Sequence, residues 1–315
     1  MARGRGERSL MPGVFESVEK TTPASGFFYL PYMTNGLSRR EGLLEDDIVG
    51  TRDPGDPDLD NPVCDGDITI PIDVDATGFW LKALLGDPTT SEVTGVYTHV
   101  FESGAWTLPS MSLERQVPDV PSFEMFSGAR ANRLQIEMQR GGRLNGTVGV
   151  IAQGAATPAG STAAGTPTSF GELPSRFMQR EGVVKIGGST VANVVGLSFE
   201  YNNNLDPVET ITADGFIGGL DPMRAACSGT MRLRFDSETL FAAAKAGTGQ
   251  TISLEWTKSA SASLVLALGR VKLSVPGRPI DGPGGIEAEF QWMAGREANG
   301  DPMLTATLVN EVDAY

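Results

Sequence analysis

The chain has 315 residues, and its 39 Asp and Glu against 25 Lys and Arg give a formal net charge of −14. That charge argues against proteins that hold DNA by its phosphates, and two cysteines, Cys64 and Cys227, are too few for a disulfide framework or a Cys-rich zinc site. No apolar run is long enough to span a bilayer, and the N-terminus lacks the hydrophobic core of a signal peptide. The length suits two domains of about 150 residues each.

The N-terminal residues 1–13 carry Arg3, Arg5 and Arg8 among glycines. This composition is typical of a flexible arm, which we predict for residues 1–13. The alternative, that the three arginines bind nucleic acid or an acidic surface, stays open.

Residues 41–67 are strongly acidic, with Arg52 as the only base and prolines at 54, 57 and 62. This composition predicts a long, extended and irregular loop. Loops of this length in a compact domain are usually functional or disordered, so the loop is a candidate to cross to a neighbouring subunit. Its ten acids are Glu41, Glu45, Asp46, Asp47, Asp53, Asp56, Asp58, Asp60, Asp65 and Asp67.

The spacing of Asp56, Asp58 and Asp60 invites a calcium-loop interpretation. An EF-hand loop needs Gly at its sixth position and Glu at its twelfth, where this chain has Asn61 and Asp67. We therefore expect no metal site in the loop.

A short helix is predicted over Asp75 to Gly86, with the sequence DATGFWLKALLG. Asp75 is placed to cap its first turn and Gly86 to end it. Directly upstream, Ile70, Ile72 and Val74 alternate with other residues, which is typical of a half-buried strand.

The same pattern returns at Asp236 to Gly247, DSETLFAAAKAG, after alternating Met231, Leu233 and Phe235. Two such units in the same register indicate a duplicated domain, although Asp caps and Gly stops are common enough to agree by chance. Four predicted strands follow each helix, namely Tyr97–Glu102, Met111–Val117, Leu134–Met138 and Thr147–Ala152, then Thr251–Trp256, Leu264–Leu273, Ile286–Phe290 and Thr305–Val309.

A stretch rich in Gly, Ala, Ser and Thr, residues 153–169, separates the two patterns and predicts a flexible linker or a surface loop at the domain boundary. The fold class that follows is mainly β, with two tandem β-sandwich or barrel domains, each flanked by one short α-helix. We place domain 1 at residues 14–155, the linker at 156–182 and domain 2 at 183–315.

Catalytic motifs are missing from the sequence. His99, the only histidine, lies in a predicted strand with no nucleophile signature near either cysteine, and we expect it to be half-buried or exposed. Ser17 and Lys20 match an SxxK pattern, but its companion motifs are absent. No nucleotide loop or His-rich metal set is present, so we predict a structural or binding protein that is not an enzyme and needs no cofactor.

Several stretches resemble the tail tube protein family of long-tailed, siphovirus-type bacteriophages. They are IPIDVDATGFWLKALLGD, FSGARANRLQIEMQRGGRLNGTVGVIAQG, TVANVVGLSFEYNNNLDPVETITADGFIGGLDP, GGIEAEFQWMA and MLTATLVN, within a match from about Ile68 to Asn310. The resemblance implies packed antiparallel sheets with a flanking helix, and rings that close by continuing sheets between subunits. Stacked rings would form a hollow tail tube that conducts genomic DNA during ejection without sequence-specific binding.

The resemblance also implies partners and a place: other copies of the chain, the tail terminator, tape-measure and distal tail proteins, in a virion tail assembled in the host cytoplasm. Related rings use six single-domain subunits, so a duplicated domain predicts three chains per ring, a trimeric pseudo-hexamer. A two-domain β-sandwich binding module, such as a virion surface or glycan-binding protein, remains the alternative. The candidate contacts between stacked rings are Arg3, Arg5, Arg8, Asp46, Asp47, Asp56 and Asp58.

Overall fold

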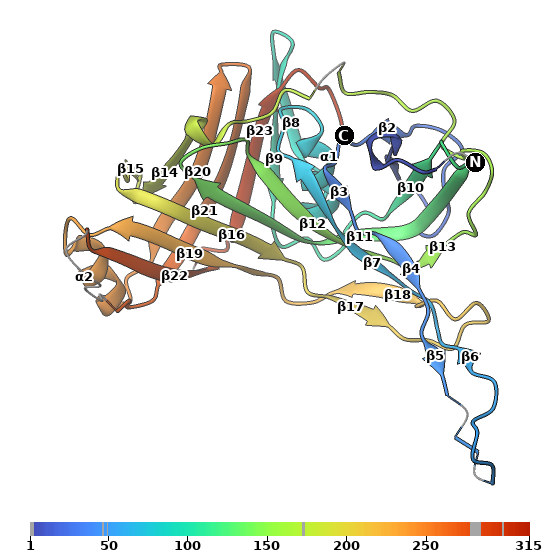
Figure 1. Ribbon diagram of the computed structural model, residues 1–315. Coiled ribbons are helices and arrows are strands. Elements are labelled where there is room, and N and C mark those ends of the chain that lie inside the picture. The colour runs from blue at the N-terminus through green and yellow to red at the C-terminus, as the bar shows by residue number, and fades with distance from the viewer. Residues whose placement is uncertain (1–2, 46, 49, 172–173, 278–284, 298) are drawn as a thin grey trace.

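The computed structural model describes residues 3–45, 47–48, 50–171, 174–277, 285–297 and 299–315. The fold is mainly β, with one α-helix in each half of the chain, α1 (Thr77–Leu85) and α2 (Thr239–Ala246). The predicted fold class is therefore confirmed. In Figure 1 the first half lies on the right and the second half on the left, and a narrow arm leaves the first half at the lower right.

Antiparallel strands build the first half. They are β1 (Pro12–Phe15), β2 (Phe28–Tyr29), β3 (Thr34–Asn35), β4 (Ser38–Arg40), β5 (Leu43–Leu44), β6 (Asp58–Leu59), β7 (Val63–Pro71), β8 (Thr89–Val93), β9 (Val96–Glu102), β10 (Met111–Val117), β11 (Ser122–Gln139), β12 (Asn145–Ala152) and β13 (Gly154–Ala155), with a 3₁₀ turn η1 (Gly6–Arg8) before them.

The second half begins with a 3₁₀ turn, η2 (Gln179–Glu181). Its strands are β14 (Gly182–Ile186), β15 (Ser189–Thr190), β16 (Val194–Asn202), β17 (Leu205–Val208), β18 (Gly219–Pro222), β19 (Ala226–Arg234), β20 (Gln250–Ser259), β21 (Ala262–Leu273), β22 (Glu287–Gly295) and β23 (Leu304–Asn310). The strands predicted after each helix all lie within observed strands or match them closely, but β11 begins at Ser122, well before the predicted Leu134, and β22 continues past Phe290 to Gly295.

Both halves repeat one order of strand pairing. In the first half the pairs run β2–β1–β10–β11–β12–β7, and β7 also pairs with β3 and β4. In the second half they run β15–β14–β20–β21–β22–β19–β16. The short strand β13 returns to pair with β11, as β23 returns to β21. This shared order is the structural form of the repeat seen in the sequence.

The hairpin of β8 and β9 has no counterpart in the second half. The order along the chain suggests matching Tyr97–Glu102 with Thr251–Trp256, but the pairings match β10 with β20 instead. A match by order along the chain alone is therefore wrong by one strand. Strand order along a chain cannot reveal an inserted hairpin, because the hairpin has the same apolar alternation as the strands around it.

Two strand pairings join the halves. Residues 133–139 of β11 pair with residues 196–202 of β16, and β9 pairs with β23. One core cluster runs through both halves and includes the fully buried side chains of Phe126 and Trp256. The two halves therefore share a continuous interior.

The start of α1 depends on a residue that the sequence did not single out. Oδ1 of buried Asp73 accepts hydrogen bonds from the backbone N–H groups of Asp75 and Ala76, at 2.8 and 2.6 Å. Asp75 makes no cap, because the helix begins one residue later than expected and Ala76 occupies the N-cap position. The prediction of an Asp75 cap was therefore wrong, while the helix itself is confirmed.

The second helix likewise has no side-chain cap, since Glu238 rather than Asp236 occupies the N-cap position. Both predicted stops are confirmed. Gly86 has φ 102°, and Gly247 has the left-handed φ of 64° and donates its N–H to the last helical carbonyls. A side chain is strained in these conformations, which explains glycine at both ends.

The segment between the halves packs on the first half. Ala159 pairs with Phe123, Thr168 pairs with Phe28, and the side chain of Phe177 is fully buried. The Ala163 N–H donates to Glu114 at 2.7 Å. The small residues let this segment pack closely on the sheet. Composition alone does not distinguish such a packed segment from a flexible linker.

Candidate assembly surfaces

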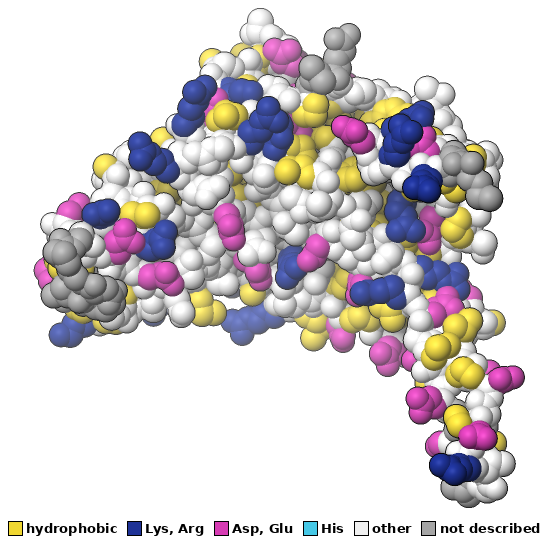
Figure 2. Space-filling model, in the orientation of Figure 1, with side chains coloured by type: hydrophobic (Ala, Val, Ile, Leu, Met, Phe, Trp, Pro, Cys, Tyr) yellow, Lys and Arg dark blue, Asp and Glu magenta, His cyan; other side chains and the backbone are white. Residues whose placement is uncertain are grey.

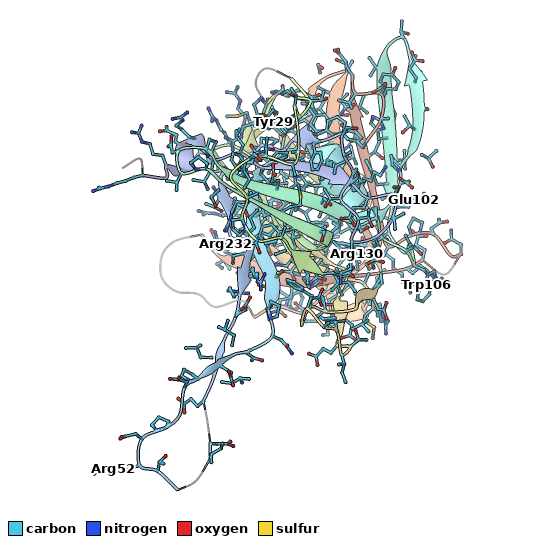
Figure 3. The ribbon with its side chains drawn as sticks, turned by 90° about the vertical axis from the view of Figure 1, so that its right-hand side faces the viewer. Tyr29, Arg52, Glu102, Trp106, Arg130 and Arg232 are labelled. Carbon is cyan, nitrogen blue, oxygen red and sulfur yellow. The ribbon has the colours of Figure 1, made fainter. Side chains whose placement is uncertain are left out.

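A narrow arm contains most of the acidic segment. Leu43 pairs with Leu59 and Leu44 with Asp58, so β5 and β6 form a short two-stranded stem. Figure 3 shows the arm extending away from the body, with Arg52 near its tip. The predicted long, extended loop is thus present, and its stem is an antiparallel ladder.

Apolar side chains on the arm were missed by sequence reasoning, which counted only its charges. The exposed fractions are 67% for Leu43, 50% for Leu44, 78% for Ile48 and 67% for Leu59. Figure 2 shows these yellow side chains beside magenta acidic ones along the arm. Apolar groups gathered on a projecting element mark an interaction surface, and their recurrence between the acids was the available signal.

Three of the acids predicted to contact another ring, Asp47, Asp56 and Asp58, are solvent-exposed and lie on the arm. Asp46 lies outside the described residues. Because Asp58 belongs to extended β6, the segment does not form the compact turn of an EF-hand. In the described part of the chain, no three His, Cys, Asp or Glu side chains gather as a metal site.

A second hairpin lies at the base of the arm. Along the chain, strands β17 and β18 connect β16 to β19, just as the arm connects β4 to β7. The Arg39 guanidinium lies 5.2 Å from the centre of the Phe216 ring, which connects this hairpin to β4. Arg130 of β11 contacts the hairpin by donating a hydrogen bond to the Leu220 carbonyl. The same guanidinium forms an ion pair with Glu19. Both hairpins project from the same side of the molecule (Figure 1).

The N-terminal arginines lie apart from the arm. Arg3 and Arg5 are exposed, and Arg8 forms an ion pair with Asp119 at 2.5 Å. Beyond them, Leu10 pairs with Gln116 through two backbone hydrogen bonds, so the end of the predicted flexible segment joins the edge of β10.

An exposed aromatic side chain, Trp106, lies in the connection between β9 and β10 and is 88% exposed (Figure 3). Sequence reasoning did not single it out. Exposed tryptophans are enriched in protein interfaces, and the Leu108 side chain nearby packs with the core of the second hairpin.

The single histidine has a structural role. His99 was expected to be half-buried or exposed, but its side chain is fully buried. Nδ1 lies 2.8 Å from the Thr90 hydroxyl and Nε2 lies 2.9 Å from the Val312 carbonyl, so the ring attaches the C-terminal tail to β9. The expectation failed because the tail covers this face of the strand, which no local pattern indicates.

The two thiols are inert by their surroundings. Burial raises the pKa of Cys64 to about 11 and raises the pKa of Cys227 further. A thiol with so high a pKa supplies little thiolate at neutral pH, so neither is an activated nucleophile.

The comparisons with known proteins agree with this geometry. Residues 6–294 match a family model described as phage tail tube protein. A search of curated proteins finds no match. In the part of the chain that the structure describes, no helix has the length and apolar character needed to cross a membrane. The chain therefore belongs to the phage tail tube protein family, whose members are structural components of the virion tail.

Proposed function

We propose that three copies of this chain close into a ring of six similar domains and that such rings stack into the tail tube. The observation that carries the proposal is the repeated pairing order, β2–β1–β10–β11–β12–β7 and β15–β14–β20–β21–β22–β19. Each half, residues 14–155 and 183–315, then acts as one tube domain. Closed rings also pair sheet edges that would aggregate in a free monomer.

The arm supplies the contact between stacked rings in this proposal. It extends beyond the body, and it combines exposed Leu43, Ile48 and Leu59 with acids. Apolar side chains on a projecting arm are stabilised when they pack on a neighbour. Arg3, Arg5 and Arg8 offer positive charge for arm acids of an adjacent ring, a pairing that is consistent with their exposure.

The assembled tube would conduct genomic DNA during ejection in a siphovirus-type tail. A net charge of −14 supports passage without binding, because an acidic wall repels phosphates. Tube assembly in the host cytoplasm, and contacts with tail terminator, tape-measure and distal tail proteins, are parts of the same proposal.

The ring stoichiometry tests the proposal. Purified rings are expected to contain three chains and to show six similar lobes by native mass spectrometry and electron microscopy. Rings of six chains, with one tube domain spanning both halves, would refute the duplicated-domain interpretation. Dispersed particles at every concentration would favour a binding module instead.

Charge reversal on the arm tests stacking separately. The double variant Asp56→Lys, Asp58→Lys is expected to shorten tubes several-fold while leaving single rings intact, because both residues are exposed and lie outside the core. The matched control is Asp206→Lys, Asp221→Lys on the second hairpin, where the two acids pair across β17 and β18. Unchanged tube length in the arm variant would remove the arm from the stacking interface.

A further inference from the structure

The junction between the two halves supplies a template for a contact between chains. Residues 133–139 of β11 pair in register with residues 196–202 of β16, from Arg133 opposite Asn202 to Gln139 opposite Gly196. This pairing covers one edge of β16, whose other edge pairs with β19.

The repeat identifies the strand that corresponds to β16. In the first half Pro71, the last residue of β7, pairs with Asn145, the first residue of β12. In the second half Arg234, the last residue of β19, pairs with Glu287, the first residue of β22. Aligning these ends matches Pro71 with Arg234 and superimposes the two pairing patterns, two residues away from the sequence repeat that matches Ile70 with Met231.

With this alignment, β3 and β4 take the place of β16. Ser38 lies opposite Asp65 of β7, as Glu200 lies opposite Ser228 of β19. Thr34 to Arg40 therefore correspond to Gly196 to Asn202, the residues of β16 that β11 covers.

The first-half edge lacks the cover that its counterpart has. Among the described residues, β4 pairs only with β7. Arg39 and Arg40 are exposed. Their counterparts in β16, which pairs with β11, are Tyr201, which is buried, and Asn202, which is half-buried. The edge of β4 is thus an unpaired sheet edge at a position that the other half keeps paired.

The matching strand is found at the far end of the second half. Beyond the last β21–β22 pair, the Ser274 N–H donates to the Gln291 carbonyl at 2.7 Å, so the ladder continues past Leu273. In the same alignment Ser274 corresponds to Arg133, and Val275 corresponds to Leu134. The side chain of Leu134, in the strand that pairs with β16, is 4% exposed, but the side chain of Val275 is 53% exposed.

We propose that Ser274–Gly277 of one copy pair antiparallel with β4 of a second copy, with Ser274 opposite Arg40 and Val275 opposite Arg39. The proposal rests on the ring proposed above and names the strands that close it. The Ser274 N–H already donates to the Gln291 carbonyl and Pro276 has no N–H, so Val275 and Gly277 supply the amide donors of this ladder.

Geometry places this contact between chains rather than within one. Figure 1 shows β4 in the right-hand half and the β21–β22 end beside α2 at the far left. A head-to-tail contact of this kind joins two different surfaces of identical subunits, and it closes a ring when the rotation per copy divides a full turn. Each ring would then alternate β11–β16 junctions within chains with β21–β4 junctions between chains.

Disulfide trapping tests the register. Directly opposed residues of antiparallel strands lie at a Cα separation of about 4.5–5.5 Å, which a disulfide can span. Oxidised rings of the variant Arg40→Cys, Ser274→Cys are expected to give covalent dimers and trimers on a non-reducing gel. Native Cys64 and Cys227 are buried and do not compete.

Two matched variants serve as controls. Arg133→Cys, Asn202→Cys places the pair at the corresponding junction within one chain. It is expected to form a disulfide inside that chain and no covalent dimer or trimer. Glu92→Cys, Ser274→Cys uses an exposed residue of β8 and is expected to give no covalent oligomer. Rings that form without an interchain disulfide between residues 40 and 274 overturn the proposed contact. Absence of rings from the wild-type protein refutes the proposed function instead.

A second variant tests the contact without cysteines. Val275→Lys leaves the fold of the monomer intact because the side chain is exposed, and it is expected to raise the concentration needed for ring formation at least tenfold, because it places a second positive charge opposite Arg39. Val275→Ile is the control that keeps the side chain uncharged. Equal ring formation by both variants, with a native circular dichroism spectrum, would overturn the proposal.

Discussion

The two helices occupy the same place in the repeat but lie in different surroundings. In α1 every residue except Lys82 is buried, whereas in α2 only Ala244 is buried. Figure 1 shows α1 within the first half and α2 at the outer edge of the second. A duplicated element can therefore form part of the core in one copy and of the surface in the other.

The C-terminus accounts for part of the difference. A Cβ added to Gly78 would lie 2.1 Å from the Tyr315 ring. The ring of Tyr315 fills this space, so any side chain at position 78 would clash with it. The Tyr315 hydroxyl donates to the Asp75 carbonyl at 2.5 Å, and Lys82 Nζ donates to the Tyr315 carbonyl at 2.6 Å. In α2 the residue after Thr239 is Leu240, whose side chain is half-buried.

Aromatic packing accounts for the rest. The Phe15 ring from β1 stacks on Phe79 with centroids 4.4 Å apart, and Phe79 contacts Trp80 edge to face at 5.6 Å. Leu240, which packs against the core, and Phe241 are half-buried. The second helix is therefore less deeply buried than the first, and β14 carries no aromatic side chain to match Phe15.

The largest expected effect separates the two helices directly. Trp80→Ala should lower the free energy of unfolding by about 3–5 kcal/mol, because it removes a fully packed indole. Phe241→Ala should cost about 1–2 kcal/mol, because its side chain is half-buried. Urea unfolding of dilute protein, followed by fluorescence and circular dichroism, measures both. Equal losses would contradict the difference between the helices.

A pH effect of intermediate size is expected at the start of α1. Burial raises the pKa of Asp73 from 3.8 to about 6. Between these values the unfolded chain has lost the proton that the folded chain keeps, so the carboxyl lowers stability progressively as pH rises through this window, by about 3 kcal/mol in total. Asp73→Asn keeps an oxygen for the two N–H donors and should remove this dependence.

The measurement is the difference in unfolding free energy between Asp73→Asn and wild type at pH 4 and pH 7.5. The variant should gain stability relative to wild type as pH rises, since other carboxyl groups cancel in the difference. A difference in unfolding free energy that stays constant across this pH range would show that burial does not raise the pKa of Asp73.

Much of the local structure could be predicted from the sequence. Alternation in Ile70, Ile72 and Val74, and glycine at Gly86 and Gly247, are local signals because strand faces and helix ends depend on a few neighbouring residues. The family resemblance was also available in this way. The candidate acids on the arm were found, although the exposed leucines beside them were not.

Other features depend on residues far apart in the chain. The role of Asp73 follows from where β7 turns, the burial of His99 follows from the C-terminal tail, and the inserted β8–β9 hairpin is visible only in the pairings. None of these leaves a periodic mark in the sequence. The sequence therefore indicates the repeat, but the order of the strands along the chain does not show which strands correspond.

By itself, the sequence determined the strand-rich class, the two helices, the repeat and the acidic balance, because each depends on local periodicity or on composition. Only the tertiary structure decided which strands correspond, which helix is buried and which sheet edge is left unpaired. The physical reason is that an edge is covered or exposed by a strand distant in sequence. Leu134 is buried beside β16, whereas Val275, at the equivalent position, has no such neighbouring strand among the described residues.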